Sequence, residues 1–179
     1  MNKTLIGVLV FLFFKISFGQ LFPFEENKKW GYRDVNGYEI IPPKYELAGQ
    51  FIDGLASVKL NGKFGKINLD EKIIIPIQYD STGSFSNGLA GVGLNGKWGF
   101  VNERGELVIP LKYDAIDAFR GEFSRVQLNG KWGVLNHSGI EVTALKYDML
   151  YYFHDGLAKV VLNGKTFYIN ELGSEIQPE

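Results

Sequence analysis

A serine or threonine nucleophile needs a nearby base, and the side chains best suited to that role in this sequence are its two histidines. His137 lies in an expected hairpin turn and His154 in an expected connection, with no helix that would align them. Their spacing matches no metal-ligand pattern, and the chain has no cysteine to act as a thiol nucleophile or zinc ligand. We interpret both histidines as solvated polar residues, and we expect no catalytic residue, no metal site and no cofactor.

Four acids that each follow a tyrosine could supply the carboxylate pair of a glycosidase. They are Glu46, Asp80, Asp114 and Asp148, and successive members are 34 residues apart. A catalytic pair is needed once, whereas these acids recur regularly along the chain. We interpret each acid as a turn cap that accepts backbone N–H groups. The sequence is therefore not expected to encode an enzyme.

The same spacing of 34 residues governs most of the chain. Asn-Gly-Lys recurs at Asn61, Asn95, Asn129 and Asn163 without insertion or deletion, and one further step back reaches Asn27. This periodicity is the signature of a repeat architecture. It divides the chain into copies at residues 27–60, 61–94, 95–128 and 129–162, and a half copy at 163–179.

Aligning the copies shows which positions are fixed. The fourth and fifth positions give Trp30-Gly31, Phe64-Gly65, Trp98-Gly99 and Trp132-Gly133, and the nineteenth gives Tyr45, Tyr79, Tyr113 and Tyr147. A Phe follows at the twenty-fifth position, and then Gly-Leu-Ala-x-Val-x-Leu in the most regular copies. We interpret the recurring Trp30, Trp98 and Trp132 as core residues, and we expect binding specificity to lie where the copies differ.

These residues resemble the WG (KWG) repeats of bacterial proteins. The resemblance covers residues 27–179 and departs from the motif at a few positions: Phe64, Glu122, Ala144 and Thr166-Phe167. It implies an all-β repeat array and a role in interactions, and it implies no shared enzyme activity.

The residues themselves indicate the same all-β fold. Leu-Ala-x-Val-x-Leu alternates as a half-buried strand does, and Asn-Gly is the preferred loop of a two-residue hairpin. The chain then returns through Lys-Trp-Gly, turns again, and enters a β-branched strand that we expect Pro110 to end, since proline cannot donate to a ladder. Each copy is thus predicted to be a three-stranded antiparallel meander, followed by about fifteen residues of connection.

Apolar residues on both faces of the middle strand predict that neighbouring copies stack on each sheet. The glycine beside each tryptophan indicates close approach of the next copy. We expect an open, curved β array, with a closed propeller as the alternative. The first copy lacks the Leu-Ala-x-Val-x-Leu strand that would close such a ring.

Residues 1–19 have the features of an export signal. Lys3 precedes ten apolar residues at 5–14, and small residues occupy Ser17 and Gly19. The apolar run is too short to span a bilayer, although a retained N-terminal anchor is the competing interpretation. The prediction is a signal peptide at 1–19, a short leader at 20–26 and a repeat domain at 27–179, with no transmembrane segment after signal removal. The location would be periplasmic, cell-surface or secreted.

The net charge of the chain limits the kinds of partner that it can bind. With 19 Lys and Arg against 20 Asp and Glu, the formal charge is -1, which argues against nucleic acid as a ligand.

Tyr151, Tyr152 and His154 occur in one copy only, so they form either an exposed partner-binding patch or a lid over the C-terminal half copy. We predict a protein or peptide partner, with a glycan as the alternative.

Overall fold

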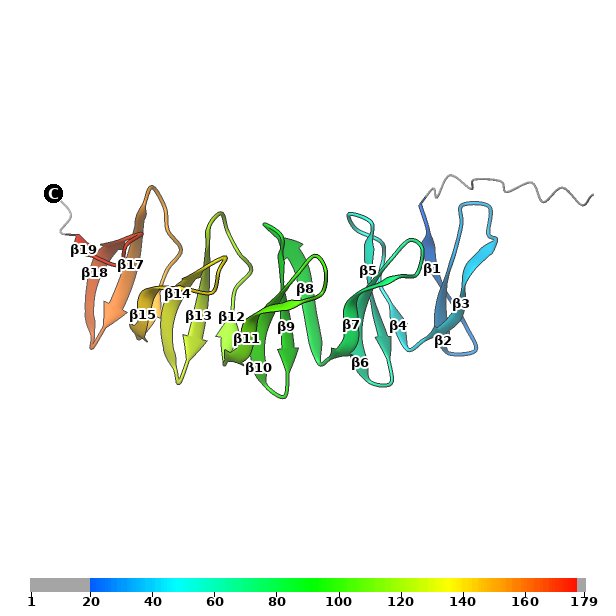
Figure 1. The fold of residues 1–179 in the computed structure, drawn as a ribbon, viewed down its shortest axis with the longest axis horizontal. Coiled ribbons are helices and arrows are strands. Elements are labelled where there is room, and N and C mark those ends of the chain that lie inside the picture. Colours follow the sequence, from blue (N-terminus) through cyan, green and yellow to red (C-terminus); the bar gives the residue numbers. More distant parts are fainter. Residues whose placement is uncertain (1–19, 177–179) are drawn as a thin grey trace, which may run out of the picture.

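The computed structural model describes residues 20–176, and within this range the chain forms nineteen β-strands and no helix. The predicted signal peptide at 1–19 lies outside the described residues. The strands form five separate sheets that follow one another along the chain, and within each sheet every strand pairs antiparallel with the strands next to it in sequence. Figure 1 shows these sheets in a row, with the first at one end of the molecule and the last at the other. The array is open, as predicted, and the alternative of a closed propeller is wrong.

The sheets are numbered here in chain order. Sheet 1 contains β1 (Phe22–Glu26), β2 (Lys29–Arg33) and β3 (Glu39–Tyr45). Sheet 2 contains β4 (Leu47–Ala48), β5 (Leu55–Leu60), β6 (Lys63–Asn68) and β7 (Ile73–Tyr79). Sheet 3 contains β8 (Ser81–Ser86), β9 (Leu89–Leu94), β10 (Lys97–Asn102) and β11 (Leu107–Tyr113). Sheet 4 contains β12 (Ala115–Ile116), β13 (Phe123–Leu128), β14 (Lys131–Asn136) and β15 (Glu141–Tyr147). Sheet 5 contains β16 (Met149–Leu150), β17 (Leu157–Leu162), β18 (Lys165–Asn170) and β19 (Glu175–Ile176).

The predicted meander of three strands is present in every sheet, and sheets 2 to 5 add a fourth strand from the expected connection. This added strand is only two residues long in three of the sheets, so it carries no alternation that a sequence pattern could reveal. The expectation that the first copy lacks its leading strand is also wrong. β1 supplies that strand from residues 22–26, in the segment predicted to be a leader.

Pro110 does not end its strand, contrary to the prediction. β11 continues to Tyr113, with Trp98 of β10 paired to Tyr113 and Phe100 paired to Ile109. The register therefore shifts across a β-bulge, in which three residues of β11 oppose Gly99. Proline is tolerated there because β11 is an edge strand, where its missing N–H leaves no ladder bond unmade.

The glycine after each tryptophan faces this bulge. A Cβ on Gly99 would lie 2.4 Å from the Ile109 carbonyl oxygen, and one on Gly31 would lie 2.3 Å from the Ile41 oxygen. The close approach is therefore real, but it comes from the next strand of the same sheet. The prediction that the following copy makes this contact is wrong.

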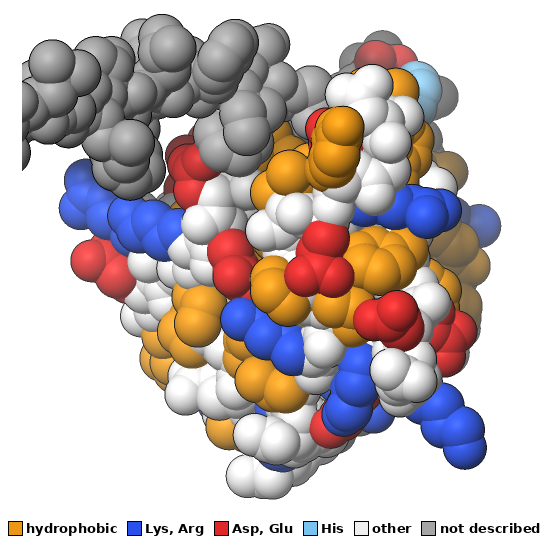
Figure 2. Space-filling view, turned by 90° about the vertical axis from the view of Figure 1, so that its right-hand side faces the viewer, with side chains coloured by type: hydrophobic (Ala, Val, Ile, Leu, Met, Phe, Trp, Pro, Cys, Tyr) orange, Lys and Arg blue, Asp and Glu red, His pale blue; other side chains and the backbone are white. Residues whose placement is uncertain are grey.

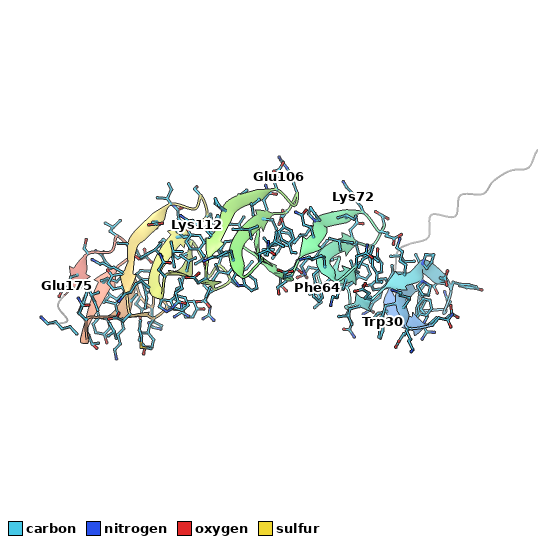
Figure 3. The ribbon with its side chains drawn as sticks, turned by 90° about the horizontal axis from the view of Figure 1, so that it is seen from below. Trp30, Phe64, Lys72, Glu106, Lys112 and Glu175 are labelled. Carbon is cyan, nitrogen blue, oxygen red and sulfur yellow. The ribbon has the colours of Figure 1, made fainter. Side chains whose placement is uncertain are left out.

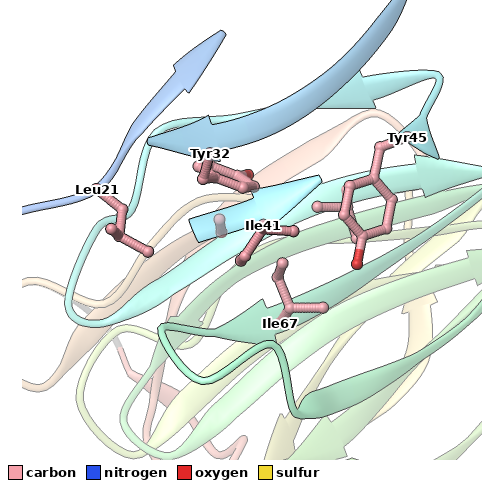
Figure 4. Packing of buried hydrophobic residues seen from close by; sticks show 7 residues of the cluster. Leu21, Tyr32, Ile41, Tyr45 and Ile67 are labelled. Atoms are coloured by element: carbon pink, nitrogen blue, oxygen red, sulfur yellow. The ribbon is translucent and has the colours of Figure 1, made fainter. Parts of the chain in front are cut away.

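The hydrophobic core is divided into four clusters, one between each pair of adjacent sheets. Figure 4 shows the first cluster, where Tyr32, Ile41 and Tyr45 of sheet 1 and Leu21 pack toward Ile67 of sheet 2. The nineteenth-position tyrosines are buried in all four copies: Tyr45, Tyr79, Tyr113 and Tyr147. A single sheet cannot bury both faces alone, so each one depends on its neighbours.

Asn-Gly hairpins line one edge of the array, as the sequence predicts. Asn95 and Gly96 have φ of 52° and 73°, which is the conformation of a type I′ turn, and the Asn-Gly pairs at Asn61, Asn129 and Asn163 match it closely. The acids at the twentieth position cap these turns. Asp80, Asp114 and Asp148 accept the backbone N–H of Asn95, Asn129 and Asn163 at 2.7, 2.6 and 2.7 Å.

Each of these aspartates also joins consecutive sheets. Lys63 of sheet 2 donates to Asp80 Oδ1, while Asp80 Oδ2 accepts the backbone N–H of Asn95 in the hairpin turn of sheet 3. The lysine bond, and then the backbone bond, lower the pKa of the Asp80 carboxyl below its usual value. The prediction that the acids are turn caps is confirmed.

The outer face of sheet 1 forms one end of the array. Figure 2 shows hydrophobic side chains interspersed there with charged groups of both signs. Among residues 20–176, no helix is long and apolar enough to cross a membrane.

Candidate binding groove

Pockets recur between successive sheets at the same repeat positions. The pocket between sheets 2 and 3, called here the sheet 2–3 pocket, has a volume of about 220 Å³ and is lined by Gly49, Gln50, Ile52, Asp53, Leu55, Ser57, Lys66, Ser84 and Phe85. The sheet 4–5 pocket measures about 100 Å³ and is lined by Arg120, Phe123, Arg125, Val134, Tyr152 and Phe153. All six of the latter stand two repeats after residues of the sheet 2–3 pocket. The two pockets are therefore copies of one site.

A third pocket lies at the interface between them. It measures about 210 Å³ and is lined by residues of β8, β9 and β10 together with Ile116, Asp117 and Ala118. We call this series of pockets the groove. The floor of each pocket is a cross-strand pair of residues on the two central strands of a sheet. The rim is formed by the segment that precedes these central strands and by the corresponding segment of the next sheet.

The chemistry of the groove changes from one pocket to the next. The facing pair is Ser57 and Lys66 in sheet 2, Gly91 and Phe100 in sheet 3, and Arg125 and Val134 in sheet 4. In sheet 1 the position of Lys66 belongs to Tyr32, which is buried and donates its hydroxyl to the Gly49 carbonyl oxygen at 2.8 Å. The copies therefore share a backbone and differ in the groups that they present in the groove.

Lys66 is the most unusual side chain of the groove, because it is only 7% exposed. Its ammonium donates to Ser57 Oγ at 2.8 Å, and burial lowers its pKa below the ordinary value of 10.5. A buried cation is costly unless a hydrogen-bonded anion accompanies it. Ser57 is neutral, so the pair either lets the lysine act as a base toward the serine or prepares the ammonium for an anion.

The sheet 4–5 pocket is built around a ring held between two cations. The guanidinium carbons of Arg125 and Arg120 lie 3.7 and 3.8 Å from the centre of the Tyr152 ring. Arg125 also donates to Asp117 Oδ2 and to the Leu150 carbonyl oxygen, both at 2.6 Å, which fixes its orientation. Such cation–π contacts hold Tyr152 firmly in place.

The structure separates the three residues predicted as a partner-binding patch. Tyr152 lies in the groove against sheet 4, whereas the lid hypothesis placed it over the C-terminal half copy. Tyr151 is exposed, with its ring centre 5.8 Å from Lys159 Nζ. His154 is also exposed, and its Nδ1 lies 3.0 Å from Asp155 Oδ2. The groove takes up only Tyr152 of this set.

His137 differs from the sequence interpretation of a solvated residue. Its ring stacks on Phe119 with centroids 4.3 Å apart, and its Nδ1 lies 3.5 Å from Glu122 Oε2. It is therefore partly buried beside the interface of sheets 3 and 4. In residues 20–176, no three His, Asp or Glu side chains come together as a metal site would require.

The three tryptophans are half-buried, and Trp30 and Trp132 pack against core clusters, so they border the core rather than lying fully inside it. Figure 3 shows Trp30 and Phe64 on one side of the array, with Lys72 and Glu106 on the turns at the opposite side. Trp98 covers its cross-strand partner Gly93, whose Cβ position would be 3.2 Å from the indole. The indole thus shields backbone that glycine would otherwise leave open.

The sequence analysis does not predict Ser57 and Lys66, because it expects the base beside a serine to be a histidine. The signal was nevertheless in the alignment of the copies. The sixth position reads Tyr32, Lys66, Phe100, Val134 and Tyr168, so a single cation stands in a column of apolar and aromatic residues.

The fold and the groove define an open array of stacked antiparallel β-repeats. The WG-containing repeat family matches residues 30–64, 64–98, 98–132 and 132–165, so the chain belongs to this family.

Solved structures show a distant likeness to this chain. Hsv2 of Kluyveromyces marxianus is 13% identical with a TM-score of 0.46, and the match covers 89% of this chain and 59% of that one. Hsv2 of Kluyveromyces lactis is 14% identical with a TM-score of 0.43, covering 85% and 58%. A protein of unknown function from Bacteroides caccae is 14% identical with a TM-score of 0.33, covering 88% and 76%. This chain thus spans less than two thirds of the Hsv2 chains. No curated protein matches the sequence.

Proposed function

We propose that this chain is an exported, non-enzymatic repeat module that binds a protein or peptide along the groove. The observation that carries the proposal is the contrast between constant and variable positions. Core tyrosines, turn caps and bulge glycines repeat in copy after copy, whereas the groove presents Ser57 and Lys66, then Gly91 and Phe100, then Arg125 and Val134. A row of differing pockets on a regular scaffold suits an extended partner read at several points.

A glycan partner is less well supported by the same groove. Sugar binding by stacking needs an open aromatic face, and Tyr152 lies between two guanidinium groups. The indole of Trp98 packs over Gly93 of its own sheet, so that face of the ring is not open to a sugar. The polar and cationic groups of the groove are better matched to peptide side chains and backbone.

Export is the part of the proposal that rests on the sequence alone. We expect the native protein to begin at Gln20, because Lys3, the apolar run at 5–14 and the small residues Ser17 and Gly19 form a cleavable signal. Intact mass measurement of protein from the native cell tests this expectation. A chain that retains Met1 and fractionates with the cytoplasm would contradict it.

Filling one pocket of the groove should weaken partner binding without disturbing the fold. Ser84 is an exposed rim residue of the sheet 2–3 pocket, and Tyr152 occupies the equivalent position two repeats later. We therefore expect Ser84→Tyr to fold normally and to weaken partner binding by about 2 kcal/mol or more, as loss of an interface anchor does. The measurement uses peptides selected from a random displayed library on the purified chain, with affinities compared by calorimetry.

Ser138→Tyr is the matched control for this variant. Ser138 is exposed on a turn away from the groove, and Leu172 at the equivalent position shows that a large side chain is tolerated there. Selected peptides should bind this control as they bind the parent. Peptides that bind Ser84→Tyr equally well would show that the groove is not the binding surface.

A further inference from the structure

The sheet 2–3 pocket contains a cation with unused hydrogen-bonding capacity. An ammonium has three donors. In the part of the chain that the structure describes, Lys66 uses one of them, toward Ser57 Oγ at 2.8 Å, and forms no ion pair. Burial of this group without a counter-charge opposes folding, which a repeat could avoid with the aromatic or apolar residue that the other copies carry. Lys66 thus departs from the residue types of the other copies, lowers the stability of the fold, and lines a pocket.

Ser57 adds a second donor beside the first. It stands directly opposite Lys66 on the paired strands β5 and β6. Because its oxygen accepts from Lys66, its own hydroxyl proton remains available, and no acceptor for it is found among residues 20–176. Two adjacent donors, one charged and one neutral, match the two oxygens of a carboxylate.

We propose that the sheet 2–3 pocket binds a carboxylate on a short aliphatic stem, with Lys66 and Ser57 holding its two oxygens. In the proposed function this group is carried by a partner peptide, either as a glutamate side chain or as the C-terminal carboxylate. The carboxylate site itself rests on Lys66 and Ser57, and only the identity of its carrier rests on the proposed function.

The walls of the pocket favour this ligand over a phosphate. Ile52, Leu55 and Phe85 supply apolar surface for a stem, and the volume of about 220 Å³ is several times the roughly 30 Å³ that a water molecule occupies. One lysine balances a single negative charge, whereas phosphate sites generally combine several cations or backbone N–H groups. Asp53 lies on the exposed rim and forms no ion pair with Lys66.

The test uses small probes of matched shape on the intact mature chain. The acidic probes are N-acetylglutamate amide, which carries a side-chain carboxylate, and N-acetylalanine, which carries a terminal one. N-acetylglutamine amide is the neutral isostere of the first probe. Binding is followed through the ε-carbon resonance of Lys66 in isotopically labelled protein, assigned from its loss in Lys66→Met.

At least one acidic probe should shift the Lys66 resonance with saturation, and the probe that does so names the carrier of the carboxylate. The neutral isostere should bind about tenfold more weakly or worse, since a hydrogen bond to a charged group is lost. Lys66→Met should lose binding of the acidic probe by a similar factor, as monitored by the backbone amide of Ser57. Lys72→Met, which removes an exposed lysine at a position where Ile140 stands in another copy, should bind as the parent does.

Three outcomes would overturn the assignment. The first is an equal response to the acidic and neutral probes, and the second is tighter binding of inorganic phosphate than of either carboxylate. The third is hydrolysis of a p-nitrophenyl ester that depends on both Lys66 and Ser57, which would make the pair catalytic. If the chain binds a carboxylate at Lys66 but selects no peptide, the carboxylate site stands and the proposed function is contradicted. If the chain selects peptides but binds no carboxylate at Lys66, the proposed function stands and the carboxylate site is contradicted.

Discussion

Replacing Tyr113 with alanine should lower the free energy of unfolding by about 3–5 kcal/mol, the range expected when a large buried aromatic side chain is removed. Tyr113 is 1% exposed and packs with Phe100, Ile109 and Val126 between sheets 3 and 4, near the middle of the array. Because each sheet is stabilised only by its neighbours, a void at this interface also weakens the coupling between the two halves of the chain. Urea unfolding followed by circular dichroism should show the loss as a lower midpoint and a broader transition.

Tyr38→Ala provides the control for this prediction. Tyr38 is 71% exposed on the turn between β2 and β3, so its removal should change stability by no more than about 0.5 kcal/mol. Tyr113→Phe keeps the ring in the core and should retain most of the stability. Similar small losses for Tyr113→Ala and Tyr38→Ala would mean that the interfaces between sheets do not hold the array together.

The features that could be predicted from the sequence are those that a single local pattern determines. Asn95-Gly96 adopts the turn that its residues prefer, and Asp80 caps that turn as its position after Tyr79 indicates. The period of 34 residues then carries each local prediction through the whole chain. Stacking into an open array follows because both faces of the central strands are apolar.

The features that sequence analysis missed depend on contacts between strands. β12 is two residues long and exists because Ala115 and Ile116 pair with Gln127 and Val126, which no alternation in the sequence reveals. The prediction that Pro110 ends a strand rests on its missing N–H, which is a local property, whereas the tolerance of proline at an edge bulge is a property of the sheet.

The candidate site was missed for a related reason. The sequence analysis selects Tyr151, Tyr152 and His154 because they are close in sequence and occur in one copy only. Of these three residues, only Tyr152 lies in the groove. Ser57 and Lys66 are nine residues apart and meet only because β5 and β6 pair in that register. The column of sixth positions singles out Lys66 as a cation among apolar and aromatic residues, whereas Ser57 is recognised only when paired positions are compared across copies.

Alanine substitutions at three glycines should show a graded loss of stability that follows the geometry of the bulge. A Cβ on Gly99 would be 2.4 Å from the Ile109 carbonyl oxygen and 2.8 Å from the Pro110 carbonyl carbon, so it collides with backbone that cannot move aside. We expect Gly99→Ala to cost about 3 kcal/mol, at the upper end of the usual range for overpacking. Urea midpoints measured on the single variants test this value.

Gly133 occupies the equivalent position in the copy where Ala144 replaces the proline. Its Cβ would meet the flexible Leu145 Cδ2 at 2.9 Å, and the nearest carbonyl oxygens would be 3.1 Å away, so Gly133→Ala should cost only about 1 kcal/mol. Gly83→Ala is the control, because a Cβ there meets nothing closer than 3.5 Å and the backbone conformation is ordinary; its stability should be unchanged or slightly higher. Equal losses at Gly99 and Gly133 would show that the strictness of the Trp-Gly motif comes from something other than the bulge. The predicted order instead makes the glycine most costly to replace in the copies that also carry the proline, which are those of Gly31, Gly65 and Gly99.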